Sequence, residues 1–505
     1  MTQVLATADF DIEWRKYASG TVIDFADAGV IALLRSRKVI DARAVAVAAA
    51  ITAGATQVVH TAGKPQNTRQ VGYTEDPVSG APTVLAPGLA AVNQSARLGR
   101  GGGRRAARIF YNRHSVVAND AAGRTHHMVV ELPAQFDQIM LVAVNNQAAQ
   151  VVNFQATICT MADLSNINNS VADNRWTSLV NWSANNGNST IAQVPVSPGQ
   201  VSGRDRKSYI VSEPISVSSV PKTDGVKGAY LGIRFFMRTD LPTYTVLGNG
   251  TTDLLSQWAT RPSGKGTIIC RSKVGQFVQN NSTVAGFDSV TNENTTPIAG
   301  VIALYRGRVV GVVRNGDSIA DGRGNPVGEG FMWPACGAAS DAEVTFVDSN
   351  MGCPGQPGAV FYQDMKDLFN SPVGKYLDAS VLHSASPNDI AATITDADIT
   401  AIRLRFNDAL DFLERLGKVA LPVTWAPSNT AIKNYGTTDA LRVAYNAYVR
   451  SLPLAVIDID AVLAGATVGG QVQMRDEYED DGIHPNNPGN YAIVPSAAAQ
   501  VRRLK

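Results

Sequence analysis

The chain has 505 residues, of which 45% are hydrophobic and 17% charged, and its formal net charge at pH 7 is +1. This length allows more than one hydrophobic core, and the composition is that of a globular chain and not of a disordered one. A net charge so close to zero gives no overall attraction to nucleic acid or to anionic membranes, so such a role would need a local basic patch.

The N-terminal residues 1–9 lack a basic region followed by an apolar core, so we expect no signal peptide. The most apolar stretch, residues 39–55, contains Asp41 and Arg43 and is too short and too rich in alanine for a membrane span. We therefore expect synthesis in the cytoplasm. Action outside the cell would follow lysis, a dedicated export system, or incorporation into a particle.

The four cysteines include no C-x-x-C pair, which argues against a zinc site: Cys159, Cys270, Cys336 and Cys353. Cys336 and Cys353 could form a disulfide, but buried free thiols are the favoured interpretation. The adjacent His126 and His127 would point to opposite faces of a strand, so we expect no metal there. We predict neither a metal nor a cofactor.

Residues 1–108 are expected to form an arm of helices and loops. Residues 24–37 and 41–53 carry good helix formers, and Gly54 provides a stop. Residues 61–90 are rich in Gly, Pro and Thr and indicate extended loop. The arm ends in a Gly/Arg-rich basic segment, residues 97–108. We interpret this segment as a flexible hinge or an inter-subunit contact rather than as a nucleic-acid contact.

From about residue 110 to 250 the hydrophobic period is two, which is typical of strands. The strand-like runs are residues 126–132, 137–145, 151–159, 209–217 and 230–237. They predict an antiparallel, jelly-roll-like β-sandwich within residues 109–296, of which 251–296 is the linker to the last domain. Trp176 and Trp182 lie beside an Asn-rich loop and would suit a sugar platform, but a core position is the favoured interpretation.

Residues 297–505 alternate strands with helices, which predicts a three-layer α/β domain with a mostly parallel sheet. The strand candidates are residues 298–304, 309–313, 343–348, 376–383, 419–425 and 454–459. Apolar residues at helical spacing indicate helices around 399–416 and 441–448, and residues 495–504 indicate a closing helix.

Ser318 follows the apolar run 309–313 within Gly316-Asp317-Ser318. A serine on the turn at the carboxyl end of a buried strand is where α/β enzymes present a nucleophile. Two of the six histidines, His383 and His484, lie in the same part of the chain. His383 is expected to be a residue at the end of a strand near the pocket.

His484 has a carboxylate three residues before it, in Asp480-Asp481-Gly482-Ile483-His484. One local turn can place Asp481 against Nδ1 of His484 and leave Nε2 free to take the serine proton. Asp480 is the weaker candidate for this orienting role. The alternative interpretation is an acidic surface loop with an incidental histidine.

Four blocks follow one another in the C-terminal part of the chain: Gly316-Asp317-Ser318, Asn350-Met351-Gly352-Cys353-Pro354-Gly355, Ser386-Pro387-Asn388-Asp389 and Asp481-Gly482-Ile483-His484. In this order they resemble the SGNH, or GDSL-type, hydrolase family, over the C-terminal part only. The third block departs from the family's G-x-N-D, because Ser386 stands where the family usually has glycine. This departure bears on the local backbone more than on Asn388.

The resemblance implies a serine esterase with Ser318 as nucleophile, His484 as base and Asp481 as the residue that orients the base. It also implies an oxyanion hole formed by the backbone amides of Ser318 and Gly355 and the side-chain amide of Asn388. Such donors, aimed where charge develops, supply the largest electrostatic contribution to acyl transfer. Trp333 and Trp425 would suit a pocket wall, although ordinary packing is the favoured interpretation.

The favoured function is hydrolysis of small acyl esters, above all acetyl esters, on a carbohydrate or polysaccharide. This step is analogy, because family members with a β-sandwich ahead of the hydrolase domain often act on polysaccharides. A lipase-like or thioesterase activity is the alternative within the class, and no long apolar lid segment is visible. The hypothesis from another class is a structural subunit of a phage virion or tail carrying this domain. Its N-terminal region would contact particle partners or further copies of the chain.

Overall fold

The computed structural model describes part of the chain, with gaps. The described residues are 2–5, 10–12, 15–17, 22–25, 73–75, 82–84, 103–110, 115–118, 124–146, 151–161, 179–182, 190–219, 230–237, 244–248, 268–274, 298–323, 330–390 and 393–505. The chain divides into two compact units. One comprises residues 1–97, 407–419 and 451–454, and the other comprises residues 98–406, 420–450 and 455–505.

In the first unit the described residues before residue 97 form three short antiparallel strand pairs. These are β1 (Thr2–Leu5) with β4 (Val22–Phe25), β2 (Phe10–Ile12) with β3 (Arg15–Tyr17), and β5 (Tyr73–Glu75) with β6 (Pro82–Val84). The helix predicted at 24–37 is wrong at residues 24–25, which belong to β4, and the rest of it lies outside the described residues. The predicted helix at 41–53 lies wholly outside them.

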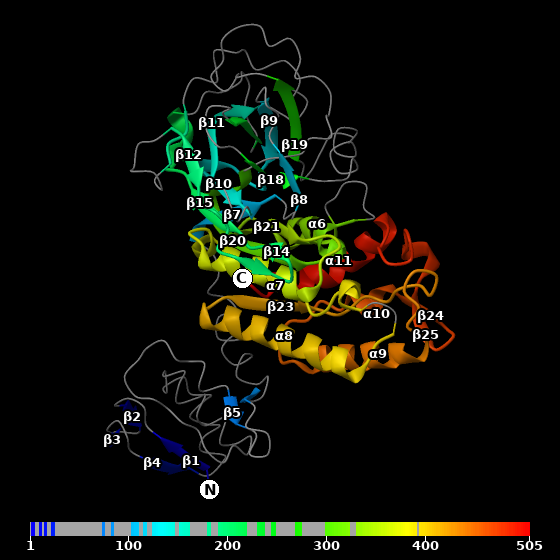
Figure 1. Ribbon diagram of the computed structural model, residues 1–505. Coiled ribbons are helices and arrows are strands. Elements are labelled where there is room, and N and C mark those ends of the chain that lie inside the picture. The colour runs from blue at the N-terminus through cyan, green and yellow to red at the C-terminus, as the bar shows by residue number, and fades with distance from the viewer. Residues whose placement is uncertain are drawn as a thin grey trace. The chain divides into compact units, whose positions relative to one another are not determined.

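The second unit contains a five-stranded antiparallel sheet in the order β12-β11-β17-β9-β19 (Figure 1). Its strands are β12 (Ala192–Val194), β11 (Val152–Met161), β17 (Tyr230–Met237), β9 (Arg124–Glu131) and β19 (Ile268–Val274). β11, β17 and β9 match predicted strand-like runs. β19 lies inside residues 251–296, which were predicted to be a linker, so that prediction is wrong at β19. Two further pairs are β8 (Ser115–Ala118) with β18 (Tyr244–Gly248), and β13 (Gln200–Val201) with β14 (Arg204–Asp205).

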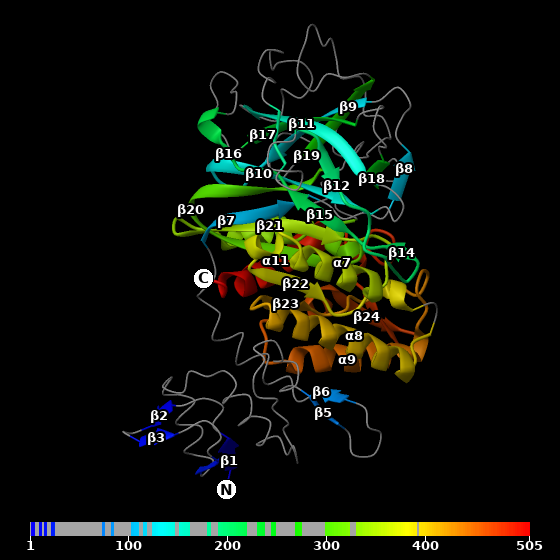
Figure 2. The ribbon, with the colours of Figure 1, turned by 60° about the vertical axis from the view of Figure 1, so that its left-hand side comes forward.

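An eight-stranded mixed sheet lies beside the five-stranded one in both ribbon views (Figures 1 and 2). Its path is β15-β10-β20-β22-β23, with β16 on β10 and both β7 and β21 on β20. The strands are β7 (Gly103–Ile109), β10 (Phe136–Asn145), β15 (Ser208–Val211), β16 (Ile215–Ser216), β20 (Ile298–Gly316), β21 (Val344–Gly352), β22 (Ala379–His383) and β23 (Val419–Val423). A jelly-roll-like connectivity for the antiparallel strands stays a prediction.

β20 joins the antiparallel and the parallel strands of this sheet. Its first part pairs antiparallel with β10 and β7, and its second part pairs parallel with β21 and β22. The sequence predicted two strands here, because the polar Arg306-Gly307-Arg308 between the apolar runs looks like a turn. In the structure these three residues stay extended while Arg306 bonds Asp137 and Arg308 bonds the Lys505 carbonyl. The predicted boundary between residues 296 and 297 thus lies directly before a strand that pairs with β10 of the predicted sandwich.

β7 occupies the second half of the predicted basic hinge, so the hinge assignment is wrong for residues 103–108. Arg104 and Arg105 are exposed and bond Asp137 and Gln138 of β10. Arg108 is buried, donates to the Glu131 carbonyl, and stacks on the ring of Trp333 at 3.9 Å. Because partners elsewhere in the chain bind these arginines, a segment with the composition of a linker forms a strand.

The parallel strands have the order β21-β20-β22-β23, which changes direction at β20. At such a point the loops that leave the carboxyl ends of neighbouring strands diverge and open a crevice. The predicted strand at 454–459 is wrong: it contributes a single parallel bridge between Ile457 and Val423. A short antiparallel hairpin that was not predicted is formed by β24 (Ala464–Val468) and β25 (Gln471–Met474).

Seven α-helices and several 3-10 turns accompany the described parallel strands. The α-helices are α5 (Ser318–Asp321), α6 (Met332–Ala339), α7 (Gly358–Asn370), α8 (Asp396–Arg415), α9 (Asp439–Ser451), α10 (Ile459–Leu463) and α11 (Asn487–Arg502). α6 packs on α11 and β21, while α7 packs on β20 and β21. The helices predicted around 399–416 and 441–448 are confirmed as α8 and α9, and α11 starts before the predicted 495, at the Asn486 cap.

Burial decides several sequence interpretations. Trp182 is 0% exposed and packs edge-on against Phe154, so it is core and not a sugar platform, while Trp176 lies outside the described residues. Cys159, Cys336 and Cys353 are buried free thiols, which confirms the favoured interpretation for these three. No helix in the described part of the chain is long and apolar enough to cross a membrane. Within that same part, no group of three or more acidic, His or Cys side chains could hold a metal ion.

Because β20 pairs with antiparallel strands in its first part and with parallel strands in its second, a fragment that lacks the antiparallel strands should be less stable. A fragment of residues 297–505 keeps the whole of β20 but lacks β10 and β7, so the first part of the strand becomes an unpaired apolar edge. We expect this fragment to aggregate, or to melt well below a fragment of residues 98–505, when both are followed by circular dichroism. Equal melting temperatures would contradict the dependence of β20 on its antiparallel partners.

Candidate active site

Ser318 starts α5, directly after β20 ends at Gly316, and its side chain is buried (5% exposed). Asp317 caps the turn, because its Oδ1 accepts a hydrogen bond from the Ile319 amide at 2.9 Å. The position of Gly316 has no room for a side chain, since a Cβ there would meet Cγ of His383 at 2.6 Å. Close packing on both sides thus presents Ser318 at the carboxyl edge of the sheet.

His484 lies in the loop before α11 and reaches Ser318 with its ring. The Ser318 Oγ to His484 Nε2 distance is 2.6 Å, and His484 Nδ1 lies 2.8 Å from either carboxylate oxygen of Asp481. The Asp481 Oδ1 also accepts the backbone amides of His484 and Ile483 at 3.0 and 3.2 Å. The local turn expected from the three-residue spacing therefore forms, and the three side chains make one hydrogen-bonded row.

The charge of Asp481 is held by its neighbours. Partial burial tends to raise the pKa of this carboxyl, but the hydrogen bond and the charge of the His484 ring, together with two backbone amides, outweigh it and lower the pKa below its ordinary value. An ionised Asp481 suits an acceptor for the Nδ1–H of the ring. Asp480, the weaker candidate, is exposed and binds the loop through its backbone amide, which donates to the His484 carbonyl at 2.9 Å.

His383 lies at the end of β22 and faces Gly316. It is 3% exposed, stacks on Phe331 with ring centroids 6.4 Å apart, and its Nε2 has no hydrogen-bond partner among the described residues. Burial lowers the pKa of His383, with Asp317 opposing and Arg314 reinforcing this shift. Such a ring stays neutral and packs against the turn that carries Ser318, in agreement with the expectation of a strand-end residue.

Gly355 and Asn388 come from loops after β21 and β22, and both are exposed. The loop that carries Gly355 is tied to the turn of Ser318 by the Cys353 amide, which donates to the Gly316 carbonyl at 2.9 Å. Gly355 has a φ of +71°, a conformation that favours glycine. The side-chain amide of Asn388 donates to the carbonyl of Gln356, the residue after Gly355, at 3.3 Å. The loops of the second and third blocks therefore lie side by side.

Asp389 was not assigned a role from the sequence, yet it joins the same two loops. Its carboxylate accepts the amide of Gly358, the first residue of α7, at 3.1 Å and the amide of Ser386 at 3.2 Å, and it pairs with Arg405 of α8 at 3.0 Å. Burial raises the pKa of Asp389, against the opposing charge of Arg405 and the two amides. Its position beside Asn388 in the third block was the available sequence signal.

The segment between β23 and residue 436, residues 424–435, holds the loop of His484 in place, although no sequence motif marks this segment. The Asn429 amide donates to the Gly482 carbonyl at 2.6 Å, and the Met474 amide of β25 donates to Asn429 Oδ1 at 3.0 Å. Gly482 has a φ of +84°, and a Cβ there would meet Ile432 at 2.9 Å. One turn further on, Lys433 Nζ donates to the Ile390 carbonyl at 2.7 Å, just past the third block. This segment thus bridges the third and fourth blocks.

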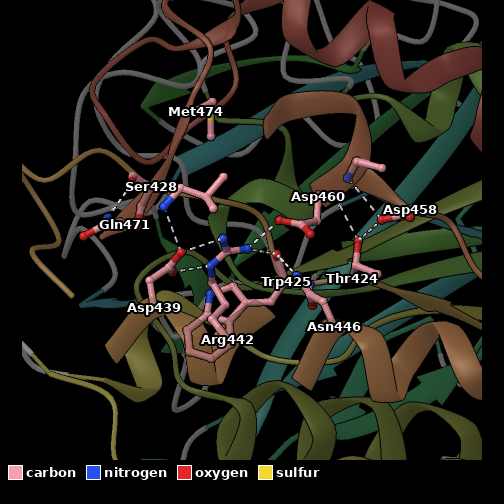
Figure 3. Close-up of polar contacts among 12 residues, drawn as sticks. Thr424, Trp425, Ser428, Asp439, Arg442, Asn446, Asp458, Asp460, Gln471 and Met474 are labelled. Carbon is pink, nitrogen blue, oxygen red and sulfur yellow. Dashed lines mark hydrogen bonds and ion pairs between the residues drawn. The ribbon is translucent and has the colours of Figure 1, made fainter. Parts of the chain in front are cut away.

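A buried chain of alternating charges anchors this segment, as Figure 3 shows around Arg442. Arg442 is 0% exposed and binds Asp439 at 2.6 Å, Asp460 at 2.5 Å and the Trp425 carbonyl at 3.1 Å. Asp439 also accepts the Val472 amide of β25 at 3.0 Å. Trp425 precedes Asn429 in this segment and β25 binds Asn429, so the ion chain holds the segment at these two contacts.

The two tryptophans considered for a pocket wall, Trp333 and Trp425, both pack on other side chains. Trp425 is 2% exposed and packs edge-on against Tyr435, so it is a packing residue. Trp333 is half-buried at the start of α6 and covers Arg108. Both agree with the favoured interpretation of ordinary packing.

Comparisons with known proteins find solved structures that are similar to part of the chain. No protein-family model matches the chain, and no curated protein matches it. A lipase from a goat rumen metagenome is 17% identical, with a TM-score of 0.31, and the match covers 39% of this chain and 100% of that one. A member of the lipolytic protein G-D-S-L family from Veillonella parvula is 17% identical, with a TM-score of 0.27, over 37% of this chain and 96% of that one.

The acetylxylan esterase Axe2 from Geobacillus stearothermophilus is another such structure. It is 15% identical, with a TM-score of 0.29, over 38% of this chain and 94% of that one. Each of these three structures is thus similar to between 37% and 39% of this chain. What its own site can do follows from the positions of its own side chains.

The buried ion pairs of Arg442 predict that replacing Arg442 destabilises the protein more than replacing Arg450 does. Arg442→Ala would leave Asp439 and Asp460 buried without this partner, which typically costs about 3–5 kcal/mol. Arg450, whose side chain is 34% exposed, pairs with Asp458 at 2.7 Å and Asp460 at 2.6 Å, and Arg450→Ala is the control. Because a partly exposed pair such as Arg450–Asp458 contributes only about 0–1 kcal/mol, and Arg442 would still pair with Asp460 in the control, urea unfolding should separate the two variants. Equal losses would contradict the role given to the buried arginine.

Proposed function

We propose that this chain is a serine ester hydrolase of the SGNH type, with Ser318, His484 and Asp481 as its triad. The observation that carries the proposal is the 2.6 Å contact between Ser318 Oγ and His484 Nε2, with Asp481 on the far side of the ring. A buried serine on a capped turn, a ring nitrogen aimed at it and a carboxylate behind the ring are what nucleophilic acyl transfer needs.

In the proposed reaction Ser318 Oγ attacks the ester carbonyl carbon while His484 Nε2 takes the hydroxyl proton. Asp481 holds Nδ1–H, so it keeps the tautomer and stabilises the imidazolium that forms. The tetrahedral intermediate then expels the alcohol, which receives the proton from His484, and an acyl-serine remains. Water, deprotonated by His484, attacks the acyl-serine, and collapse of the second intermediate releases the acid and returns the proton to Ser318.

The proposed oxyanion hole consists of the amides of Ser318 and Gly355 and the side-chain amide of Asn388. In support, the hydrogen bond between Asn388 and Gln356 keeps the second and third loops together, and both loops follow strands next to β20. Each such donor contributes about 10²–10³ in rate to acyl transfer. Asn388 is exposed and its bond to Gln356 is long at 3.3 Å, so an arriving oxyanion competes readily for that hydrogen.

The substrate class that we propose is a small acyl ester, above all an acetyl ester, on a carbohydrate. Support comes from the absence of a long apolar lid segment in the sequence and from the β-rich region ahead of the hydrolase strands, by the family analogy given above. No observation on the described residues favours the alternative of a phage particle subunit, and that alternative stays a prediction.

The triad assignment predicts the effect of removing the nucleophile. Ser318→Ala should reduce turnover of p-nitrophenyl acetate by on the order of 10⁶-fold, because the attacking oxygen is lost. The melting temperature should stay close to that of the unaltered protein, which serves as the control for folding. Undiminished turnover in a folded variant would refute the assignment.

The substrate proposal predicts a preference for short acyl chains. We expect the kcat/KM for p-nitrophenyl acetate to exceed that for p-nitrophenyl octanoate, and acetate to be released from at least one acetylated polysaccharide in a panel. The Ser318→Ala variant gives the background for both assays. A preference for octanoate would favour the lipase-like alternative.

A further inference from the structure

The hydroxyl of Ser386 lies where the first, second and third blocks meet, and the side chain is fully buried. Its Oγ donates to Asp317 Oδ2 at 2.6 Å. It accepts the backbone amide and the side-chain amide of Asn388, each at 3.1 Å. A hydroxyl has one proton and two lone pairs, so these three bonds use its full capacity. The Gln356 carbonyl, at 3.4 Å, is the weaker competitor for the proton, because the carboxylate is charged and closer.

At one end of this arrangement is Asp317, the residue before the nucleophile, which is also fully buried. Its Oδ1 accepts the Ile319 amide and so caps the turn that carries Ser318, while its Oδ2 accepts the Ser386 hydroxyl. Both oxygens are thus engaged, and the orientation of the turn depends on both. A charge-assisted bond of 2.6 Å is among the strong ones.

At the other end is the side chain of Asn388, which is exposed and has few other restraints. Besides Ser386, its side-chain nitrogen contacts the Gln356 carbonyl at 3.3 Å. An exposed amide without the 3.1 Å bond to Ser386 would be free to sample other rotamers. The hydroxyl of Ser386 therefore fixes the position of Asn388 relative to the turn of Ser318.

We propose that Ser386 is a positioning residue that couples the nucleophile turn to the oxyanion donor Asn388 through one hydroxyl. This proposal rests on the function proposed above. A glycine, which the related family usually has at this place, could make neither the bond to Asp317 nor the bond to the Asn388 side chain. In this chain the alignment of the two catalytic loops depends on a side chain and not on backbone alone.

A purely structural role is the competing explanation. Ser386 is also the N-cap of the short helix η7 (Pro387–Asp389), in a capping box with Asp389. Loss of a cap lowers stability without a selective effect on the chemical step. Loss of positioning lowers kcat while leaving KM nearly unchanged, because the aligned donor acts on the transition state.

The test compares Ser386→Ala and Ser386→Gly with Ser384→Ala. Ser384 is a matched control: it is equally buried, lies two residues earlier, and its hydroxyl makes no hydrogen bond among the described residues. For p-nitrophenyl acetate we expect both Ser386 variants to lose roughly ten- to a hundred-fold in kcat, the factor for a hydrogen bond to a charged group. KM should stay nearly constant, and Ser384→Ala should match the unaltered protein. Neither variant adds atoms, and glycine is the milder replacement at an N-cap, so the second variant keeps the test valid if alanine destabilises the cap.

An unchanged kcat in a folded Ser386 variant would overturn the proposal while leaving the esterase function standing. The same holds if stability falls and kcat does not, or if Ser384→Ala loses as much as Ser386→Ala. If the unaltered protein hydrolyses no ester, the proposed function fails, and the coupling is then read from melting temperatures of Ser386→Ala, Asp317→Ala and the double variant. Non-additive shifts in melting temperature would support the link between Ser386 and Asp317, whereas additive shifts would refute it.

Discussion

The pairing of β20 with strands on both halves of its length is the constraint on which the rest of the second unit depends. Its first part needs β10 and β7, and its second part needs β21 and β22. Ser318 follows the end of this strand, so the turn that carries it depends on a strand whose first part is hydrogen-bonded to antiparallel partners. Alternative placements of Ser318 would require breaking a ladder that spans both kinds of sheet.

The site itself is an assembly of loops that are fastened to one another by polar contacts. Asp389 joins the third block to the start of α7, and Asn429 joins the segment after β23 to Gly482 beside the triad. Behind that segment, Arg442 neutralises two carboxylates in the interior, where an unpaired charge would be costly. Loops that leave a sheet edge have no ladder of their own, so such side-chain bonds take over its role.

The four blocks were predictable because each is a local pattern after an apolar strand. The spacing of Asp481 and His484 predicted the local turn, and α8 and α9 followed from their helical periodicity. The same rules failed at Arg306-Gly307-Arg308, taken as a turn, and at residues 103–108, taken as a hinge. In both places charged and glycine residues lie in an extended strand, because partners such as Asp137 of β10 satisfy them from another part of the chain. Local propensity cannot register such partners.

By itself, the sequence determined which residues could form the site and which kind of local structure would present them. It could not determine the position of Ser318 relative to His484, which lies 166 residues away, or the roles of Asn429 and Arg442. It also left Ser386 as a mere departure from a familial glycine, whereas the fold makes its hydroxyl the link between Asp317 and Asn388. The physical reason is the same in each case: patterns of period and spacing are local, while hydrogen-bond distances between loops arise only when the strands have been ordered in a sheet.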